Sequence, residues 1–543
     1  MDVFVKIIIT FLLFFTPFAF AGAEPWAFSV MQYAVVICWI LLLFSHRRIV
    51  FSSVFKPIFC VVGFLILLTL LQSFFVKTQL DVTVWYPVTF MPLYGWEHIS
   101  LFITYLAVAA LVPQLYVSQS DIQKLLFWVV ISNVAVALCM ASFPKGDYIF
   151  YLTGVRGGIG PFLNRNHAAL FLVMGALCSL GLFFTAQLRY HKLASSQQRK
   201  SFYIQQICLF GVFAGLATGA VMTRSRGGML SLLIGLFTYS FLCVWAVPNQ
   251  LKKRLKGVFI ALVALVCVCG WVYTHVEDIN AFAHRGTGAS AQTRRMMYRA
   301  ALDIVAQHPV WGIGVGAMPV VITSYTDYPI KSYIEHLHND WLEILLGVGY
   351  GGAVPIALGL LWFIGLALKR LKRLEIRKQF LFAALLSALV ALCVGSCVDF
   401  HFFIPANALL FFMLAGSVCA LTYAKHHVHS IHLNIFNRIL IGVVLVASLY
   451  IPTQKTLAWR QVVFGAGLKT QAKLAQYEQA LQHYPSPRYA VRLGNAYLNA
   501  SHRAASVEEK EALRQKAFSI ATLYLQLYPR EKELSYLYMR TKN

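Results

Sequence analysis

The chain has 543 residues, 59% of them hydrophobic and 12% charged, and a soluble globule usually carries about 25% charged residues. Its formal net charge of +25 does not indicate nucleic-acid binding, because most basic residues lie in short loops and no zinc-type cysteine pairs or basic-aromatic patch occur. Repeated apolar stretches near the bilayer-spanning length of about 20 residues predict an all-α polytopic membrane protein instead.

Apolar stretches succeed one another along most of the chain and predict about 12–13 transmembrane helices. They are 4–22, 27–45, 54–75, 98–117, 122–142, 166–187, 204–222, 228–247, 257–274, 343–368, 379–397, 403–424 and 436–452. The first could be a secretory signal, since Ala19-Phe20-Ala21 resembles a cleavage site, but we expect a retained helix. The eleven cysteines all lie in or beside these stretches, so no disulfide framework is expected.

The basic loops between these stretches predict the orientation. Clusters at 46–48, 189–200, 252–256 and 369–378 all fall on one side when the spans are counted, which the positive-inside rule makes cytoplasmic. The other side then receives the long loop 275–342, loops 76–97 and 143–165, and the turns 222–227 and 398–401. We expect a multi-pass membrane protein with these segments on the non-cytoplasmic side.

The end of the chain differs in composition, which predicts a membrane domain over 1–452 and a helical tail over 453–543 on the non-cytoplasmic side. Leu481-Gln482-His483-Tyr484-Pro485 recurs as Leu525-Gln526-Leu527-Tyr528-Pro529, a spacing of 525 − 481 = 44. This resembles a degenerate tetratricopeptide-type hairpin, whose usual period is about 34, with an insert near 501–511. A plain amphipathic helical cap remains the alternative.

Two arginines outside the cytoplasmic loops stand at the tight turn Thr223-Arg224-Ser225-Arg226-Gly227-Gly228. Arginine near lipid is costly, so Arg224 and Arg226 are either snorkelling to the interface or functional. The functional interpretation is an anion site, because guanidinium offers a planar fork of donors that fits phosphate oxygens and the following helix N-terminus favours anions.

A second polar cluster precedes the span at 166–187. It combines glycines with Arg156, Asn164, Arg165 and His167. The glycines alone indicate only a turn, but the arginines, amides and imidazole together favour a hydroxyl-rich or anionic ligand.

The long loop contains an amphipathic helix at 293–307, with Arg294 and Arg295 near its start, which we expect to cover the site. The loop ends in His336-Leu337-His338-Asn339-Asp340-Trp341-Leu342-Glu343, followed by a glycine-rich span that predicts close helix packing. His338 is the candidate general base, with His336, Asn339 and Asp340 as ligand contacts and Asp340 or Glu343 orienting the imidazole. Zinc binding by His336, His338, Asp340 and Glu343 is the alternative, but their spacing matches no strong metal signature.

These motifs resemble the O-antigen ligase family. His338-Asn339, nine residues, then Gly349-Tyr350-Gly351-Gly352 is similar to its His-Asn-x9-Gly-x-x-Gly signature, and Arg226 to Leu230 fits its Arg-x-x-x-Leu element. Segments 160–167, 306–314 and 398–407 also resemble family segments. The resemblance spans roughly 25–450 and implies a fold like that of the type C glycosyltransferases, with no cofactor and no metal.

The resemblance also implies the activity of an inverting membrane enzyme. It would transfer a glycan from undecaprenyl diphosphate to an acceptor hydroxyl at the periplasmic face of the inner membrane. The diphosphate would be held by Arg226 and by Arg294 or Arg295, and His338 would activate the acceptor. The acceptor stays open between lipopolysaccharide (lipid A core), a growing polysaccharide and a protein hydroxyl, because the tail is more typical of polymerase-like and protein-modifying members.

Two alternatives from other classes also remain. A transporter of anionic lipids would need arginines and apolar spans, but it predicts ionisable residues mid-span and repeated halves. An assembly scaffold would depend on the tail. Membrane lipids are expected partners in every case, and nucleic acid in none.

Overall fold

The computed structural model describes residues 1–45, 48–76, 86–144, 158–188, 195–246, 289–325, 334–422, 428–528 and 532–542. Its membrane part contains α1 (Asp2–Phe18), η1 (Phe20–Gly22), α2 (Pro25–Ser45), β1 (Arg48–Ser52), α3 (Phe55–Phe74), α4 (Pro92–Leu115), α5 (Gln119–Ser142), α7 (Arg165–Gln187), α8 (Ser196–Met222), α9 (Arg226–Ala246), α12 (Ala289–Gln307), α13 (Met318–Val321), η3 (Ile322–Tyr325), α14 (Asp340–Leu371), α15 (Ile376–Gly395), α16 (Pro405–Leu421), β2 (Val428–His432) and α17 (Ile435–Ala447). The remaining helices are α18 (Tyr450–Ala466), α19 (Thr470–His483), α20 (Pro487–Ser501), α21 (Val507–Leu527) and α22 (Lys532–Lys542).

The membrane part is a bundle of long apolar helices, as the sequence predicted. Within the described ranges, ten helices are long and apolar enough to cross a bilayer, and α16 is a shorter apolar helix. α7 and α15 form the centre, because their residues are buried almost throughout against α8 and α9. The expected span 257–274 lies outside the described residues. The all-α prediction is confirmed, apart from one short strand pair.

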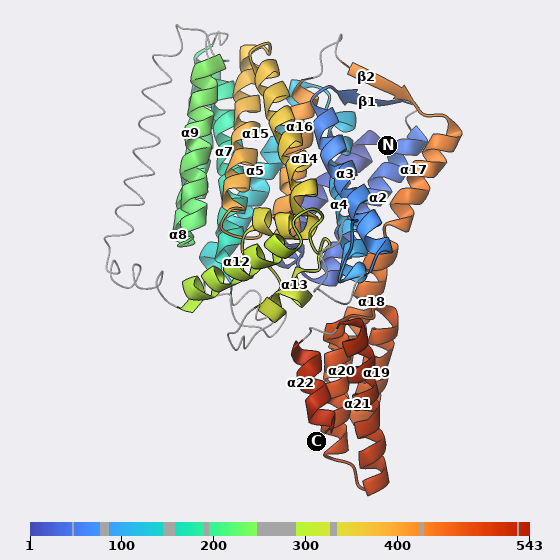
Figure 1. The fold of residues 1–543 in the computed structure, drawn as a ribbon. Helices are drawn as coiled ribbons and strands as arrows, with labels where there is room; N and C mark the ends of the chain where they lie inside the picture. The colour runs from blue at the N-terminus through green and yellow to red at the C-terminus, as the bar shows by residue number, and fades with distance from the viewer. Residues whose placement is uncertain are drawn as a thin grey trace.

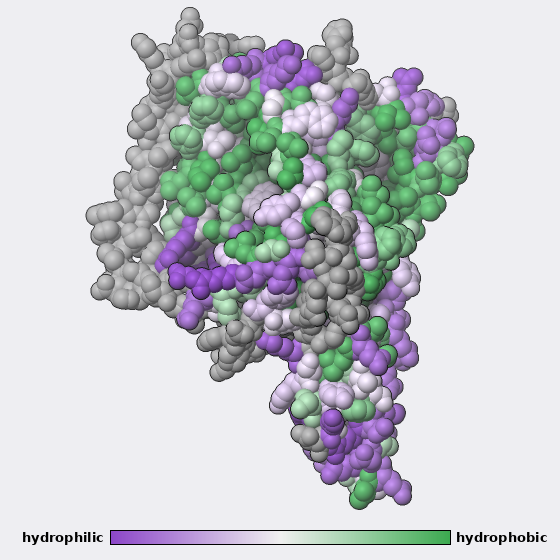
Figure 2. All heavy atoms as spheres, in the orientation of Figure 1, coloured by the Kyte–Doolittle hydropathy of each residue, from purple (hydrophilic) through white to green (hydrophobic). Residues whose placement is uncertain are grey.

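The two ends of the bundle differ. At one end β1 pairs antiparallel with β2, with Arg48 opposite His432 and Ser52 opposite Val428. α12, α13 and the C-terminal helices lie at the other end (Figure 1). Figure 2 shows hydrophilic residues along α12 and on the C-terminal helices, whereas the sides of the bundle are largely hydrophobic. We call the end that carries α12 and α13, two helices of the loop predicted to lie on the outer side, the polar end.

α14 is broken near its start by Gly349, which has φ 61° and ψ −171°. Loop 309–314 packs on the break through backbone hydrogen bonds, from Ile313 N to Leu346 O at 3.0 Å and from Tyr350 N to Pro309 O at 2.7 Å. A Cβ at Gly349 would lie 2.5 Å from the backbone of Val310, and one at Gly312 would lie 2.4 Å from Leu346 O. Gly312 and Gly349 therefore admit a loop backbone. The expected close packing of helix against helix does not occur at Gly349, whereas a Cβ at Gly352 would lie 3.0 Å from Leu68 of α3.

The C-terminal helices are attached to the bundle at two places. At the root, Tyr33 Oη and Thr453 Oγ1 lie 2.7 Å apart, and Lys455 Nζ lies 2.9 Å from Glu97 Oε2. Farther along, Val491 of α20 and Tyr524 of α21 join the hydrophobic cluster formed by α12 and α14. The tail is therefore packed against the polar end of the bundle.

The sequence repeat of the tail coincides with helix ends. The first copy, at 481–485, spans the end of α19, and the second begins in the last turn of α21. The expected insert at 501–511 covers the α20–α21 connection and the start of α21. The division at 452/453 falls near the start of α18 and stays a prediction.

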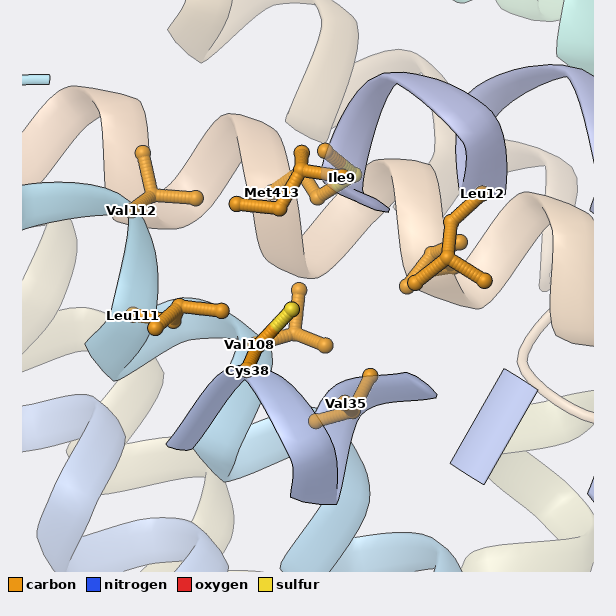
Figure 3. Close-up of a pocket in the computed structure, with 9 residues that line it drawn as sticks. Ile9, Leu12, Val35, Cys38, Val108, Leu111, Val112 and Met413 are labelled. Atoms are coloured by element: carbon orange, nitrogen blue, oxygen red, sulfur yellow. The ribbon is translucent and has the colours of Figure 1, made fainter. Parts of the chain in front are cut away.

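A small cavity lies inside the bundle, away from the polar end. Its lining is entirely apolar apart from one thiol (Figure 3). The lining residues are Ile9, Leu12, Val35, Cys38, Val108, Leu111, Val112, Leu409 and Met413. It offers no group to orient a polar substrate, unlike the loops at the polar end.

Candidate active site

Asp399 lies in the turn between α15 and α16. Residues from several predicted site segments contact its carboxylate. His338 Nδ1 lies 2.8 Å from Asp399 Oδ1, and His167 Nε2 lies 3.7 Å from the same oxygen. The side-chain amide of Asn166 donates to Oδ2, and that of Asn164 donates to it at 3.5 Å. Residues far apart in the chain therefore meet at one buried carboxylate.

The environment of Asp399 keeps it charged. Its side chain is 1% exposed, and burial alone would raise the pKa of the carboxyl. The neighbouring imidazoles of His167 and His338 outweigh burial, so the pKa lies well below its usual range. A second hydrogen bond to Oδ1 comes from the Phe400 backbone N–H at 3.0 Å. The carboxylate is thus an anionic acceptor at neutral pH.

His338 is held in an unusual backbone conformation. Its φ is 56°, in the left-handed region that costs a non-glycine residue on the order of 1–3 kcal/mol. Its side chain is 31% exposed, and the ring meets Phe400 edge-on at 5.0 Å. Since Nδ1 faces Asp399, Nε2 is the nitrogen left to act as a base toward a ligand. The sequence pointed to Asp340 or Glu343 as the orienting carboxylate, and the structure corrects this to Asp399.

His336 has a different carboxylate and a different environment. Its Nδ1 lies 3.0 Å from Glu343 Oε1, and its ring stacks between Phe400 and Phe403, each at 4.4 Å. Burial alone would lower the pKa of His336, but the charge of Glu343 outweighs burial and raises it. The half-buried His336 ring therefore favours its protonated, cationic form.

Asn339 and Asp340 make hydrogen bonds at the start of α14. The Asn339 side chain accepts from Leu342 N at 3.1 Å and caps the helix. Asp340 is fully buried, and its Oδ2 accepts from the backbone N–H groups of His401 and Phe402 at 2.7 and 3.1 Å. Both residues were expected to contact substrate. In the structure Asn339 caps α14, and Asp340 fixes the start of α14 to the turn that carries Asp399.

The four residues considered as a zinc set do not share a ligand position. His336 pairs with Glu343, His338 pairs with Asp399, and Asp340 bonds backbone amides. His167, expected as a substrate contact, is 3% exposed and lies beneath Phe400 at a ring distance of 4.6 Å. Its position supports Asp399 rather than an incoming ligand.

The predicted arginines lie at the same end of the bundle. Arg224 and Arg226 are exposed at the α8–α9 turn, where Arg224 has φ 59°. A Cβ on Gly227 would lie 2.7 Å from the Val398 side chain, so this turn adjoins the Asp399 turn. Arg294 is half-buried, and its Nη1 donates to Val398 O at 3.1 Å.

The other predicted basic residues that the structure describes make no hydrogen bond or ion pair with the His338–Asp399 pair. Arg165 and Arg295 are exposed, at the starts of α7 and α12 respectively. Arg156 lies outside the described residues. The arrangement therefore combines an Asp399–His338 pair with guanidinium groups from the α8–α9 turn and from α12, a set suited to removing a proton beside an anion.

Residues 211–357 match the family model described as O-antigen ligase. The resemblance to the O-antigen ligase superfamily is confirmed. The matched segment includes Arg224, Arg226, Arg294 and His338, whereas Asn164 and Asp399 lie outside it. No curated protein matches the chain. The family supports glycan transfer of the ligase or polymerase kind by a multi-pass membrane protein.

Asp399 is the main site residue that the sequence did not predict. The signal was present, because segment 398–407 resembled a family segment and the turn 398–401 was assigned to the same side as His338. Asp340 and Glu343 are much closer to His338 in the chain than Asp399, which lies 61 positions away.

Proposed function

We propose that this protein transfers a glycan from undecaprenyl diphosphate to an acceptor hydroxyl, with His338 as general base. The observation that carries the proposal is the 2.8 Å contact between His338 Nδ1 and the ionised Asp399. His338 lies in the segment that matches the O-antigen ligase family. An imidazole oriented by a buried carboxylate is a recurring arrangement for proton abstraction from a hydroxyl.

The reaction is a single displacement. His338 Nε2 takes the acceptor O–H proton while the oxygen attacks the anomeric carbon. The bond between that carbon and the diphosphate oxygen breaks, and its electron pair leaves with the diphosphate. Attack from the face opposite the leaving group inverts the anomeric configuration. Asp399 stabilises the imidazolium that forms, and general-base catalysis of this kind contributes about 10²–10⁴-fold.

The guanidinium groups stabilise the leaving group. Negative charge grows on the diphosphate as the glycosidic bond breaks, and fixed cations outside bulk water favour that charge. Arg226, with Arg224 beside it, is the proposed diphosphate contact. One N–H group of Arg294 donates to Val398 O, and Arg295 is exposed at the next position of α12. The remaining donors of both residues are assigned to the same anion.

The orientation is part of the proposal. The basic loops predicted to be cytoplasmic include Arg48 at the start of β1 and Lys369 and Arg370 in the last turn of α14. β1 lies at the end of the bundle opposite α12 (Figure 1). By the positive-inside rule, the His338 site and the tail therefore face the periplasm of a bacterial inner membrane.

The test uses the full-length protein in detergent or nanodiscs, with an undecaprenyl diphosphate-linked glycan as donor. His338→Asn is the preferred variant, because asparagine tolerates a positive φ and alanine would add backbone strain. We expect transfer to fall by about 100-fold or more with unchanged thermal stability. His502→Asn, at an exposed position of the tail, is the matched control and should retain activity. Near-normal transfer by His338→Asn would reject the proposal.

The acceptor is resolved by supplying three classes in parallel: a lipid A core, a glycan with a free non-reducing end, and a protein with Ser or Thr hydroxyls. The donor glycan carries a label, and the class of molecule that becomes labelled is the acceptor. Movement of the lipid-linked glycan across a sealed vesicle without any transfer would instead support a transporter.

A further inference from the structure

Tyr298, on α12, contacts the backbone of the proposed base. Its hydroxyl donates a hydrogen bond to the His338 carbonyl oxygen at 2.8 Å. Burial raises the pKa of the Tyr298 hydroxyl, so it remains a donor at any working pH. The bonded carbonyl belongs to the residue with φ 56°, a conformation that persists only where surrounding contacts enforce it.

Arg294 stands four positions earlier on α12, and residues four apart share a helix face. Its guanidinium donates to the carbonyl of Val398, the residue directly before Asp399. Neighbouring side chains of one helix therefore hold the segment of the base and the segment of its carboxylate. Neither side chain touches the reacting imidazole or the Asp399 carboxylate through these bonds.

We propose that Tyr298 is a positioning residue, which together with Arg294 makes α12 a clamp that fixes the distance and angle between His338 and Asp399. The inference rests on the proposed function of His338, and it assigns to α12 a role beyond covering the site. In the clamp, Tyr298 fixes the position of the His338 backbone, and Arg294 fixes the position of the turn that carries Asp399.

The packing of α12 makes such a clamp rigid. The helix face that adjoins these two side chains is buried, as the sequence predicted, and contributes to the cluster shared with α14, α20 and α21. The buried residues are Met297, Ala300, Ala301, Ile304 and Val305. Because closely packed side chains hold one arrangement, Tyr298 and Arg294 project from a fixed helix rather than from a mobile loop.

The test is Tyr298→Phe, which removes only the hydroxyl. A net hydrogen bond of ordinary strength corresponds to a rate change of about three- to tenfold when it acts on the transition state alone. We expect kcat to fall by about that factor, while the KM for the lipid-linked donor and the melting temperature stay at wild-type values. A residue that only supports folding would lower the folded fraction and leave kcat per folded molecule unchanged.

Tyr325→Phe is the matched control. The Tyr325 hydroxyl donates to the Gln307 side chain at 2.6 Å in an exposed position near the end of the same helix. This variant should match the wild type in kcat and KM. Wild-type kcat for Tyr298→Phe, or a fall explained by loss of folded protein, would overturn the clamp.

The His338→Asn variant separates the two proposals. If His338→Asn is active, the proposed function fails. If His338→Asn is inactive and Tyr298→Phe has wild-type kcat, the proposed function stands and only the clamp fails.

Discussion

His338 Nδ1 and Asp399 Oδ1 lie 2.8 Å apart although 61 positions separate the two residues in the chain. The contact joins the loop before α14 to the turn after α15. Two further hydrogen bonds, from His401 N and Phe402 N to Asp340 Oδ2, tie the same two segments together. The proposed base is therefore oriented by a part of the chain outside the segment that matches the family.

Asp399→Asn should lower kcat by about 100-fold or more. The amide carries no charge to stabilise the imidazolium and favours the wrong histidine tautomer. Transfer rates with saturating donor and acceptor measure the effect. Asp303→Asn, on the exposed face of α12, is the isosteric control and should be neutral. A wild-type rate for Asp399→Asn would remove Asp399 from the mechanism.

Arg226→Gln should weaken binding of the product, undecaprenyl diphosphate. Hydrogen bonds to charged groups contribute about 1.5–3 kcal/mol, so the inhibition constant should rise at least about tenfold. Product inhibition of the transfer reaction measures this constant. Arg199→Gln, exposed near the start of α8, serves as control. An unchanged inhibition constant would show that the diphosphate binds elsewhere.

His401 makes stability depend on pH. It is buried, and burial together with the neighbouring His167 lowers the pKa of His401 to about 3. Below about pH 6.5 the unfolded chain binds a proton that the folded protein does not, which lowers the free energy of unfolding by up to ~1.4 kcal/mol per pH unit. Between pH 6.5 and 5 the loss reaches about 2 kcal/mol.

Melting curves at pH 7.5 and pH 5 test this dependence. His401→Gln should show a smaller fall in melting temperature between the two pH values than the wild type does. His432→Gln, on the exposed strand β2, should keep the wild-type fall. Equal falls for His401→Gln and the wild type would assign the pH dependence to other groups.

Gly349→Ala should destabilise the protein by on the order of 3 kcal/mol or more. The backbone conformation there is open essentially only to glycine, and the added methyl would lie 2.5 Å from the Val310 backbone. Gly365→Ala, on the same helix, is the matched control, because a methyl added there would have no neighbour within 4 Å. Thermal unfolding in detergent compares the two, and equal melting temperatures would contradict the account.

Transfer should be insensitive to metal chelation. His336, His338 and Asp340 are engaged by Glu343, Asp399 and backbone amides respectively, rather than arranged around one position. The rate is measured before and after treatment with EDTA. Loss of activity that zinc restores would revive the metal-site hypothesis.

The bundle was predictable because each span is a long apolar run, a signal that needs no tertiary information. The buried face of α12 was predictable for a related reason, since Met297, Ala300 and Ile304 recur at helical spacing. His338 followed from its place on the outer side among arginines. These features depend on local pattern and on counting spans.

The partner of His338 was not predictable in the same way. Asp340 and Glu343 are closer to it in the chain, but the capped start of α14 turns both toward other groups. The break at Gly349 was also missed, because a glycine in an apolar run does not reveal that a loop backbone lies against it. Both outcomes depend on tertiary contacts between distant segments.

The hydrophobic cluster shared by the tail and the site loop limits how the tail can be exchanged for that of another protein. Val491, Tyr524 and Leu534 pack into the same cluster as Met297 and Leu346, so tail and site loop form one cooperative unit. A chimera joined after α18 with a foreign tail would leave that surface uncovered. Transplanting the tail together with α12 and the loop up to α14 keeps the unit whole.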